Sequence, residues 1–142
     1  MLYLDDEVSG YTMTNNYFED AARVLELGGG RDNVFAYNVI NGTSGNAAIT
    51  FDNRGEGWAH AGCTPPGGEL VGFLARVPYT GPLWSAAFPS LAGILGDSPC
   101  SPRHNAIVGN TYCNCASGFI DRDNATVASW HSTMWGNVES CA

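Results

Sequence analysis

Thr14-Asn15-Asn16-Tyr17-Phe18 and Ala36-Tyr37-Asn38-Val39-Ile40 are the stretches that decide the fold, because their asparagines Asn16 and Asn38 lie 22 residues apart. The segments before and after them also match: Tyr3-Leu4-Asp5-Asp6, Leu25-Glu26-Leu27-Gly28 and Ala48-Ile49-Thr50-Phe51-Asp52 follow one another at steps of 22 to 24 residues. A weak self-similarity at this period is typical of a solenoid in which each repeat supplies one coil of short strands. The spacing therefore predicts an all-β fold, a parallel β-helix of a few coils.

The 142 residues are expected to form a single domain with an insertion. Short alternating apolar runs fill residues 2–56, as expected for strands with one side facing a core. Residues 57–104 break the pattern, and within them Leu83 to Leu95 has helical spacing, beginning near Pro82, ending before Gly96 and kinked or split at Pro89. Further coils or a C-terminal cap are expected over 105–142, with strand-like runs at 106–108, 118–120, 126–128 and 134–135.

Asparagines at the corners of successive coils can stack and exchange side-chain hydrogen bonds. We predict this structural role for Asn16 and Asn38, and the same role for Asn110 and Asn137 in the later coils.

The charge balance excludes some partners. The net charge is −8 and the six basic residues are all arginines, so the surface is acidic and nucleic acid is not expected as a partner. No apolar run approaches the roughly 18–20 residues of a transmembrane helix.

Five cysteines predict two disulfides and one free thiol, which suits secretion or another oxidising compartment. Cys113-Asn114-Cys115 is too tightly spaced for a zinc knuckle. Asn41-Gly42-Thr43 and Asn124-Ala125-Thr126 are glycosylation sequons, so Asn41 and Asn124 are predicted to be glycosylated. The chain starts in what resembles a strand, without the pattern of a signal peptide. We therefore expect a fragment, or a domain that packs on another chain or on a preceding region.

Alignment of the repeats gathers charged residues on one edge of the predicted solenoid. Asp5 and Asp6 fall near Gly28-Gly29-Gly30 and near Asp52, and Arg31 falls near Arg54 of the next coil. The glycines would leave this edge without side chains, which allows either the close approach of a ligand or a sharp corner. Carboxylates beside such a glycine segment resemble a saccharide cleft. The candidate catalytic residues are Asp5, Asp6 and Asp52, and the candidate substrate-binding residues are Arg31, Arg54, Trp58 and His60.

Paired carboxylates are what glycoside hydrolysis needs, one as a proton donor and the other as a nucleophile or base. Strands two coils apart are separated by roughly 10 Å, so side chains leaning together would reach either the retaining or the inverting spacing. Two alternatives stay open for the same residues. They are a structural ladder of ion pairs, and a Ca²⁺ site on Asp5, Asp6, Glu7 and Asp52, although no D-x-D-x-D loop is present. No other metal or cofactor is predicted.

Several motifs resemble a known family. Tyr3-Leu4-Asp5-Asp6, Gly28-Gly29-Gly30-Arg31-Asp32-Asn33 and Asp52-x-Arg54-Gly55 resemble the right-handed parallel β-helix repeat proteins of the pectate-lyase-like superfamily, above all the C-terminal portion of its large glycoside-hydrolase-like members. Val77-Pro78-Tyr79 and Phe88-Pro89-Ser90-Leu91 resemble the insertion of those proteins. The resemblance implies a right-handed β-helix and glycan hydrolysis, with Asp5 or Asp6 and Asp52 as acid and nucleophile.

These observations predict a carbohydrate-active domain, glycoside-hydrolase-like, that binds or cleaves a polysaccharide. The alternative is a non-catalytic structural β-helix module within a larger extracellular or organellar assembly. A polysaccharide lyase or epimerase is a third possibility, with Arg31 or Arg54 as the base or charge neutraliser.

Overall fold

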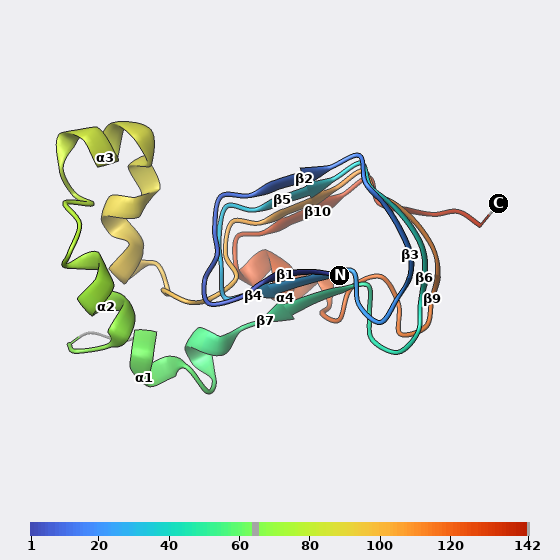
Figure 1. Cartoon of the computed structure of the whole chain (residues 1–142), viewed down its shortest axis with the longest axis horizontal. Helices are drawn as coiled ribbons and strands as arrows, with labels where there is room; N and C mark the ends of the chain where they lie inside the picture. Colours follow the sequence, from blue (N-terminus) through green and yellow to red (C-terminus); the bar gives the residue numbers. More distant parts are fainter. Residues whose placement is uncertain (64–65, 142) are drawn as a thin grey trace. The chain divides into compact units, whose positions relative to one another are not determined.

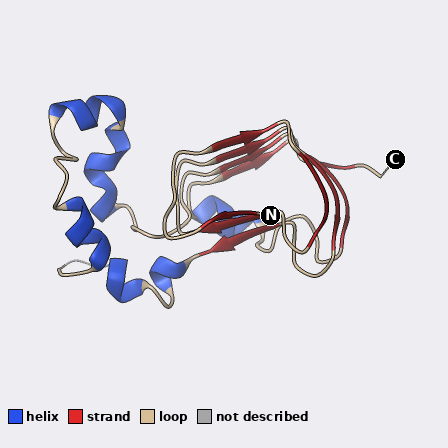
Figure 2. Ribbon diagram, in the orientation of Figure 1, coloured by secondary structure: helices blue, strands red, loops and turns tan. Residues whose placement is uncertain are grey.

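The computed structural model describes residues 1–63 and 66–141, which divide into two units. The strand unit comprises residues 1–52 and the chain from residue 101 onward, and the helical unit comprises the described residues between 53 and 100. All strands of the described residues lie in the first unit, whereas the second is built from short helices (Figure 2).

Three parallel sheets make up the strand unit. The first has the order β1-β4-β7, with β1 (Leu2–Leu4), β4 (Leu25–Gly28) and β7 (Ile49–Asp52). The second has the order β10-β8-β5-β2, with β2 (Thr12–Thr14), β5 (Val34–Ala36), β8 (Ala106–Val108) and β10 (Thr133–Trp135). The third has the order β11-β9-β6-β3, with β3 (Tyr17–Ala21), β6 (Val39–Thr43), β9 (Thr111–Cys115) and β11 (Val138–Glu139).

Each passage of the chain through the three sheets is called a coil here, and successive coils lie side by side (Figure 1). The strand register confirms the stacking that the repeat predicted, because Tyr17 pairs with Val39 and Leu27 pairs with Phe51. The chain leaves the stack after β7 and returns at β8, which pairs directly with β5.

The hydrophobic core fills the interior between the sheets. Alternate residues of each strand point inward, so the same apolar positions stack from coil to coil, as Leu4, Leu27 and Phe51 do. Phe35 and Ile107 form an equivalent column in the second sheet and are 0% and 1% exposed.

A ladder of asparagine side chains runs along one corner of the stack. The Oδ1 atom of Asn38 accepts hydrogen bonds from the backbone N–H and the side-chain amide of Asn16, at 2.9 and 3.0 Å. Asn110 accepts the same pair from Asn38, and Asn137 accepts it from Asn110. The Nδ2 atom of Asn110 also donates to the carbonyl of Phe35. The predicted structural role of these four asparagines is therefore confirmed.

A second ladder, which the sequence analysis missed, runs along another corner. Asn33 Oδ1 accepts the N–H of Tyr11, Asn105 Oδ1 accepts the N–H of Asn33, and Ser132 Oγ accepts the N–H of Asn105, each at 3.0 Å. The residue before each ladder position has a positive φ at both corners. These residues are Gly10, Asp32, His104 and His131 at the second ladder, and Asn15, Tyr37, Gly109 and Gly136 at the first.

The predicted fold class, an all-β right-handed parallel β-helix with an inserted helical segment, is wrong. Strands of two to five residues are combined with four α-helices in the described part of the chain, which indicates a small α/β domain. Because all its sheets are parallel, the strand unit is compatible with a solenoid-like stack. The sequence repeat predicts how the strands stack. It does not predict the short helices, because their formation depends on local capping residues and prolines.

Two of the predicted strands in the last coil are not strands. Residues 126–128 lie in the helix α4 (Asn124–Ser129), where Asp123 accepts the N–H of Thr126 at 2.8 Å as the N-cap. Val127 and Trp130, three residues apart, are both buried, which is the spacing of a helix face. Residues 118–120 contribute only an isolated parallel bridge from Ile120 to Ile49.

The helical unit contains five short helices in its described residues. They are η1 (Arg54–Glu56), α1 (His60–Cys63), α2 (Glu69–Leu74), α3 (Pro82–Ala87) and η2 (Pro89–Gly96). The predicted split at Pro89 is confirmed, since α3 begins at Pro82 and the 3-10 helix η2 begins at Pro89. In the described residues, no helix combines the length and the hydropathy that a membrane crossing requires.

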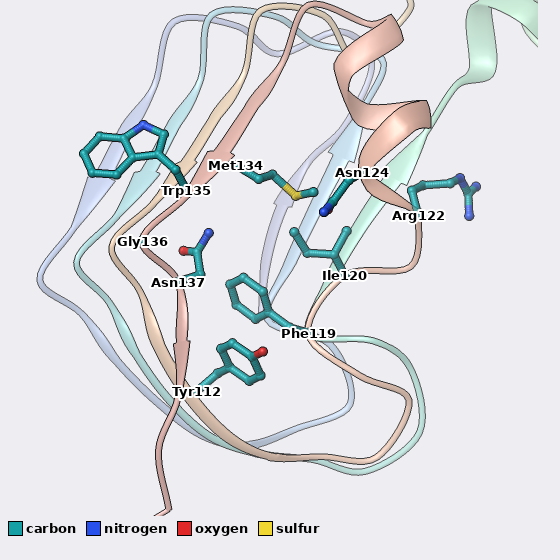
Figure 3. A pocket seen from close by; sticks show the side chains of 9 residues that line it. All are labelled: Tyr112, Phe119, Ile120, Arg122, Asn124, Met134, Trp135, Gly136 and Asn137. Carbon is teal, nitrogen blue, oxygen red and sulfur yellow. The ribbon is translucent and has the colours of Figure 1, made fainter.

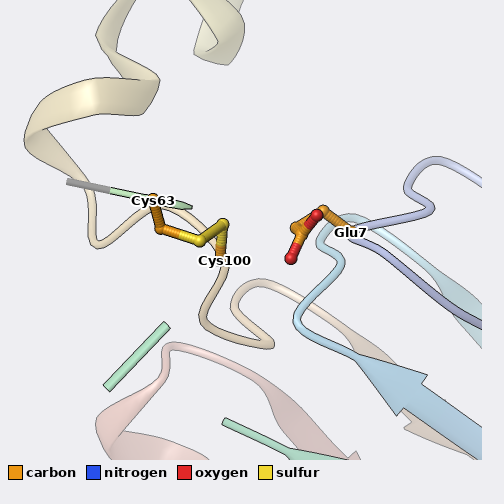
Figure 4. Close-up of side chains that lie close together, drawn as sticks. All are labelled: Glu7, Cys63 and Cys100. Atoms are coloured by element: carbon orange, nitrogen blue, oxygen red, sulfur yellow. A yellow bond between two sulfur atoms is a disulfide. The ribbon is translucent and has the colours of Figure 1, made fainter. Parts of the chain in front are cut away.

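Two disulfides are formed, Cys63–Cys100 in the helical unit (Figure 4) and Cys113–Cys141 in the strand unit. Cys115 is the remaining free thiol. The predicted count of two disulfides and one thiol is confirmed, and it is compatible with an oxidising, extracellular environment.

Replacement of Asn110 by alanine is expected to lower the free energy of unfolding by about 3 kcal/mol, measured by urea denaturation. Asn110 is 0% exposed, and its loss leaves the Asn38 N–H and the Phe35 carbonyl without their partners. A buried polar group without a partner costs roughly 1–3 kcal/mol. Asn46→Ala is the control, because Asn46 is exposed, and its change is expected to stay within about 0.5 kcal/mol. Equal losses in the two variants would contradict the ladder's role.

The disulfide pattern predicts one reactive thiol in the denatured, unreduced protein and five after reduction, counted with a thiol reagent. Cys115→Ser is expected to reduce the first count to zero. Three or more thiols before reduction would show that one of the two bonds does not form.

Candidate functional site

The outer face of the β1-β4-β7 sheet carries several carboxylates whose positions follow from the strand register. Leu4, Leu27 and Phe51 are paired across the three strands and are buried. Because successive side chains of a strand point to opposite faces, the residues that follow them, Asp5, Gly28 and Asp52, belong to the outer face. Gly28 pairs with Asp52, and the Gly28 carbonyl accepts the N–H of Glu7 at 2.9 Å. The predicted proximity of this glycine segment to Asp52 is therefore confirmed at the level of the backbone.

Glu26 lies on the same face, between the buried Leu25 and Leu27. It pairs with Tyr3 of β1 and Thr50 of β7 in the register, and its carboxylate forms an ion pair with Arg23. Tyr3 is 50% exposed, so an aromatic ring is available to solvent beside these charges.

Asp121 closes the open edge of β7. Its N–H donates to the Ile49 carbonyl at 3.1 Å, and its Oδ1 atom accepts the N–H of Phe51 at 3.0 Å. The Oδ2 atom accepts a hydrogen bond from Arg122 Nη1 at 2.9 Å. The Asp121 carboxyl group is thereby fixed one residue from Asp52. We call Asp5, Glu26, Asp52 and Asp121 the acidic face.

The surroundings of Asp121 change its acidity. Burial raises the pKa of Asp121 above the ordinary value for aspartate, against the opposing effects of the Phe51 N–H and the nearby guanidinium groups of Arg122 and Arg23. A carboxyl group that keeps its proton to higher pH has the character of a general acid. Asp121 is therefore the candidate proton donor of the acidic face.

The glycines near this face do not form an open shelf. Gly28, Gly29 and Gly30 are all buried. A side chain at Gly30 would collide with the backbone carbonyl of Val8, so this glycine is needed for close packing of two coils. The prediction that the three glycines leave a bare surface for a ligand is therefore wrong at this segment.

Asp6 and Arg31 are the other predicted residues of the strand unit. Asp6 is exposed, and its N–H bonds to Asp5 Oδ1 at 3.0 Å within a turn whose residues Asp6 and Glu7 have positive φ. Arg31 is buried, and its N–H bonds to Ser9 Oγ at 3.0 Å.

The predicted substrate-binding residues Arg54, Trp58 and His60 belong to the helical unit. Arg54 is 2% exposed and its guanidinium lies 5.1 Å from the centre of the Trp58 ring, a cation–π contact. His60 Nδ1 lies 2.9 Å from the Gly55 carbonyl oxygen. These contacts give Arg54 and His60 defined packing roles within that unit, and substrate binding by the three residues stays a prediction.

The two predicted glycosylation sites differ in environment. Asn41 lies in β6, partly buried, with its side chain bonded to Asn114 and to the Tyr17 hydroxyl. Asn124 is exposed at the first position of α4. Glycosylation stays a prediction at both.

Sequence reasoning missed Glu26 and Asp121. Glu26 had a usable signal, because a charged residue between two leucines in a repeat strand must face outward. Asp121 had none, since its partner Phe51 lies 70 residues away across the helical unit.

Comparison of the chain with protein-family models, curated proteins and solved structures found no match. The resemblance to the pectate-lyase-like superfamily is therefore supported only as far as its parallel sheets.

Carbon-13 NMR titration of the aspartate carboxyls is expected to separate Asp121 from Asp123. Asp121 should titrate above the ordinary aspartate pKa because it is buried, and Asp123 below it because its exposed carboxylate accepts the Thr126 N–H and hydroxyl. Since the folded-state pKa of Asp121 is raised, its favourable contribution is present at low pH and is lost as pH rises through that pKa. The stability of the wild type relative to Asp121→Asn should therefore fall over this pH range. Coincident titration of the two residues would contradict the assignment.

Proposed function

We propose that this chain is a carbohydrate-active domain that binds and cleaves a polysaccharide at the acidic face. The single observation that carries the proposal is the hydrogen bond from the Phe51 N–H to Asp121, which holds a second carboxyl group one residue from Asp52. Glycoside hydrolysis requires such a pair, with one group protonated and the other ionised.

In this proposal Asp121 donates a proton to the leaving oxygen, because burial favours its protonated form. Asp52 acts as the ionised partner, either as the base that activates water or as the nucleophile. Asp5 follows β1, three strand spacings and roughly 14 Å of backbone from Asp121, so Asp52 and not Asp5 is the partner in this proposal. The Arg122 guanidinium holds Asp121 in place through its 2.9 Å hydrogen bond.

The exposed ring of Tyr3 supports a saccharide as the ligand of this face. An aromatic ring provides an apolar surface with a polar tip, onto which the C–H face of a sugar ring can pack. Glu26 and Thr50, which share its position in the register, provide oxygen atoms that can bind hydroxyl groups.

A non-catalytic structural module is the second candidate, and the edges of the sheets favour it. β1, β2 and β3 are outermost in their sheets and are paired on one side only in the described residues. Unpaired strand edges offer N–H and C=O groups to another chain, so this end of the stack suits assembly with a partner.

The decisive experiment measures hydrolysis of a panel of polysaccharides by wild type, Asp52→Asn and Asp121→Asn. Each variant is expected to lower kcat at least about 100-fold, because general acid or base groups contribute roughly 10²–10⁴. In the wild type kcat is expected to fall at high pH, because Asp121 must be protonated to act. This fall is expected to be absent in Asp121→Asn.

Asp20→Asn is the matched control. Asp20 is an exposed aspartate of β3, and asparagine tolerates its positive φ of 48°. Its kcat is expected to equal that of the wild type. Turnover by Asp52→Asn and Asp121→Asn equal to that of Asp20→Asn would remove the acidic face from the mechanism. If the wild type neither cleaves nor binds any glycan of the panel, the structural module replaces this proposal.

A further inference from the structure

A pocket of about 390 Å³ lies at the end of the strand unit formed by the last coil. Its walls come from β9, from the segment before α4, and from β10 with the corner that follows it (Figure 3). The residues that line it include Tyr112, Phe119, Ile120, Asn124, Met134 and Asn137. This volume is within the range of roughly 300–1,000 Å³ that small-molecule sites occupy.

The floor of the pocket is an aromatic pair. The rings of Tyr112 and Phe119 stack with their centres 4.2 Å apart and an angle of 8° between their planes. Ile120 and Met134 lie beside them, and all four side chains are packed against the hydrophobic core. The floor is therefore an apolar surface whose two rings are held in place by packing against the hydrophobic core.

Polar groups without partners face the same space. The Tyr112 hydroxyl and the Asn124 side-chain amide make no hydrogen bond with any residue in 1–63 or 66–141. In the close-up both side chains lie beside the floor residues, Asn124 next to Ile120 and Tyr112 next to Phe119 (Figure 3). Asn137, where the asparagine ladder ends, stands on the opposite side. An apolar floor bordered by a few convergent polar groups is the arrangement of a ligand site.

The charges around the pocket favour an uncharged ligand. Arg122 is the cationic residue of the wall, but its side chain points away from the floor residues and its charge is paired with Asp121 (Figure 3). The net charge of the chain, −8, also opposes an anionic ligand. The groups left for recognition, the Tyr112 hydroxyl and the Asn124 amide, are neutral donors and acceptors, whereas Asn137 already bonds to Asn110 and to the Ile107 carbonyl.

We propose that this pocket binds one ring of a neutral sugar, whose C–H groups pack on the apolar floor built around the Tyr112–Phe119 pair and whose hydroxyl groups bond to Asn124 and the Tyr112 hydroxyl. This site is distinct from the acidic face and stands on different residues. It is a binding site only, and no reaction is assigned to it.

The test is an NMR titration of unglycosylated protein, so that the Asn124 amide is unmodified. The methyl glycosides of glucose, galactose, mannose and xylose are the probes, and the Met134 methyl and Asn124 side-chain amide signals are observed. At least one glycoside is expected to shift both signals in a saturable way. The double variant Tyr112→Phe, Asn124→Ala keeps the stacked rings and is expected to bind about tenfold more weakly, since two hydrogen bonds contribute about that factor.

Tyr17→Phe is the matched control, because Tyr17 is 60% exposed on β3 and does not line the pocket. It is expected to bind as the wild type does, and so is Asp52→Asn, which separates this site from the proposed function. Three results would overturn the inference: no saturable shift with any of the four probes, unchanged affinity in the double variant, or Met134 shifts that follow protein concentration alone. The last result would mean that a second copy of the chain covers the pocket.

Discussion

The hydrogen bonds of the asparagine ladders are the constraint on which the strand unit depends. At each corner the backbone must turn from one sheet to the next, which leaves N–H and C=O groups without strand partners. The side chain of Asn110 satisfies two of them, since it accepts from the Asn38 N–H and donates to the Phe35 carbonyl. It also donates to the side-chain oxygen of Asn137. Because buried polar groups must be paired, asparagine at these corners links each coil to the next.

The corners also fix where functional side chains lie. A residue with positive φ precedes each ladder position, so the strands between two ladders have a constant length and begin in register. Their alternation then sends Phe35 and Ile107 inward. In the neighbouring sheet the same regularity aligns Asp5, Gly28 and Asp52, while the last coil departs from it. There an isolated bridge at Ile120 takes the place of a strand and α4 follows it, and Asp121 and the aromatic pocket arise at this irregular coil.

The sequence predicted those features that are local to one repeat. The 22-residue step from Asn16 to Asn38 correctly gave the stacking and the ladder, and Pro89 correctly marked a break between helices. The second ladder was detectable, because Asn33-x4-Asn38 is repeated as Asn105-x4-Asn110. The all-β class was wrong because helices such as α4 are set by a cap, here Asp123, within a segment whose apolar residues also suit a strand.

The sequence by itself determined the repeat, the inward-facing residues, the ladder asparagines and the number of disulfides. These features follow from the repeat period, the alternation of apolar and polar residues and the composition, all of which can be read directly from the sequence. Only the tertiary structure decided that Asp121 accepts the Phe51 N–H and that the Val8 backbone occupies the space beside Gly30. It also decided that Arg54, Trp58 and His60 belong to a different unit from Asp52. The physical reason is that these contacts join residues that are distant along the chain. Phe51 meets Asp121 across residues 53–100 and Gly30 meets Val8 between the first two coils, and no local pattern encodes such packing.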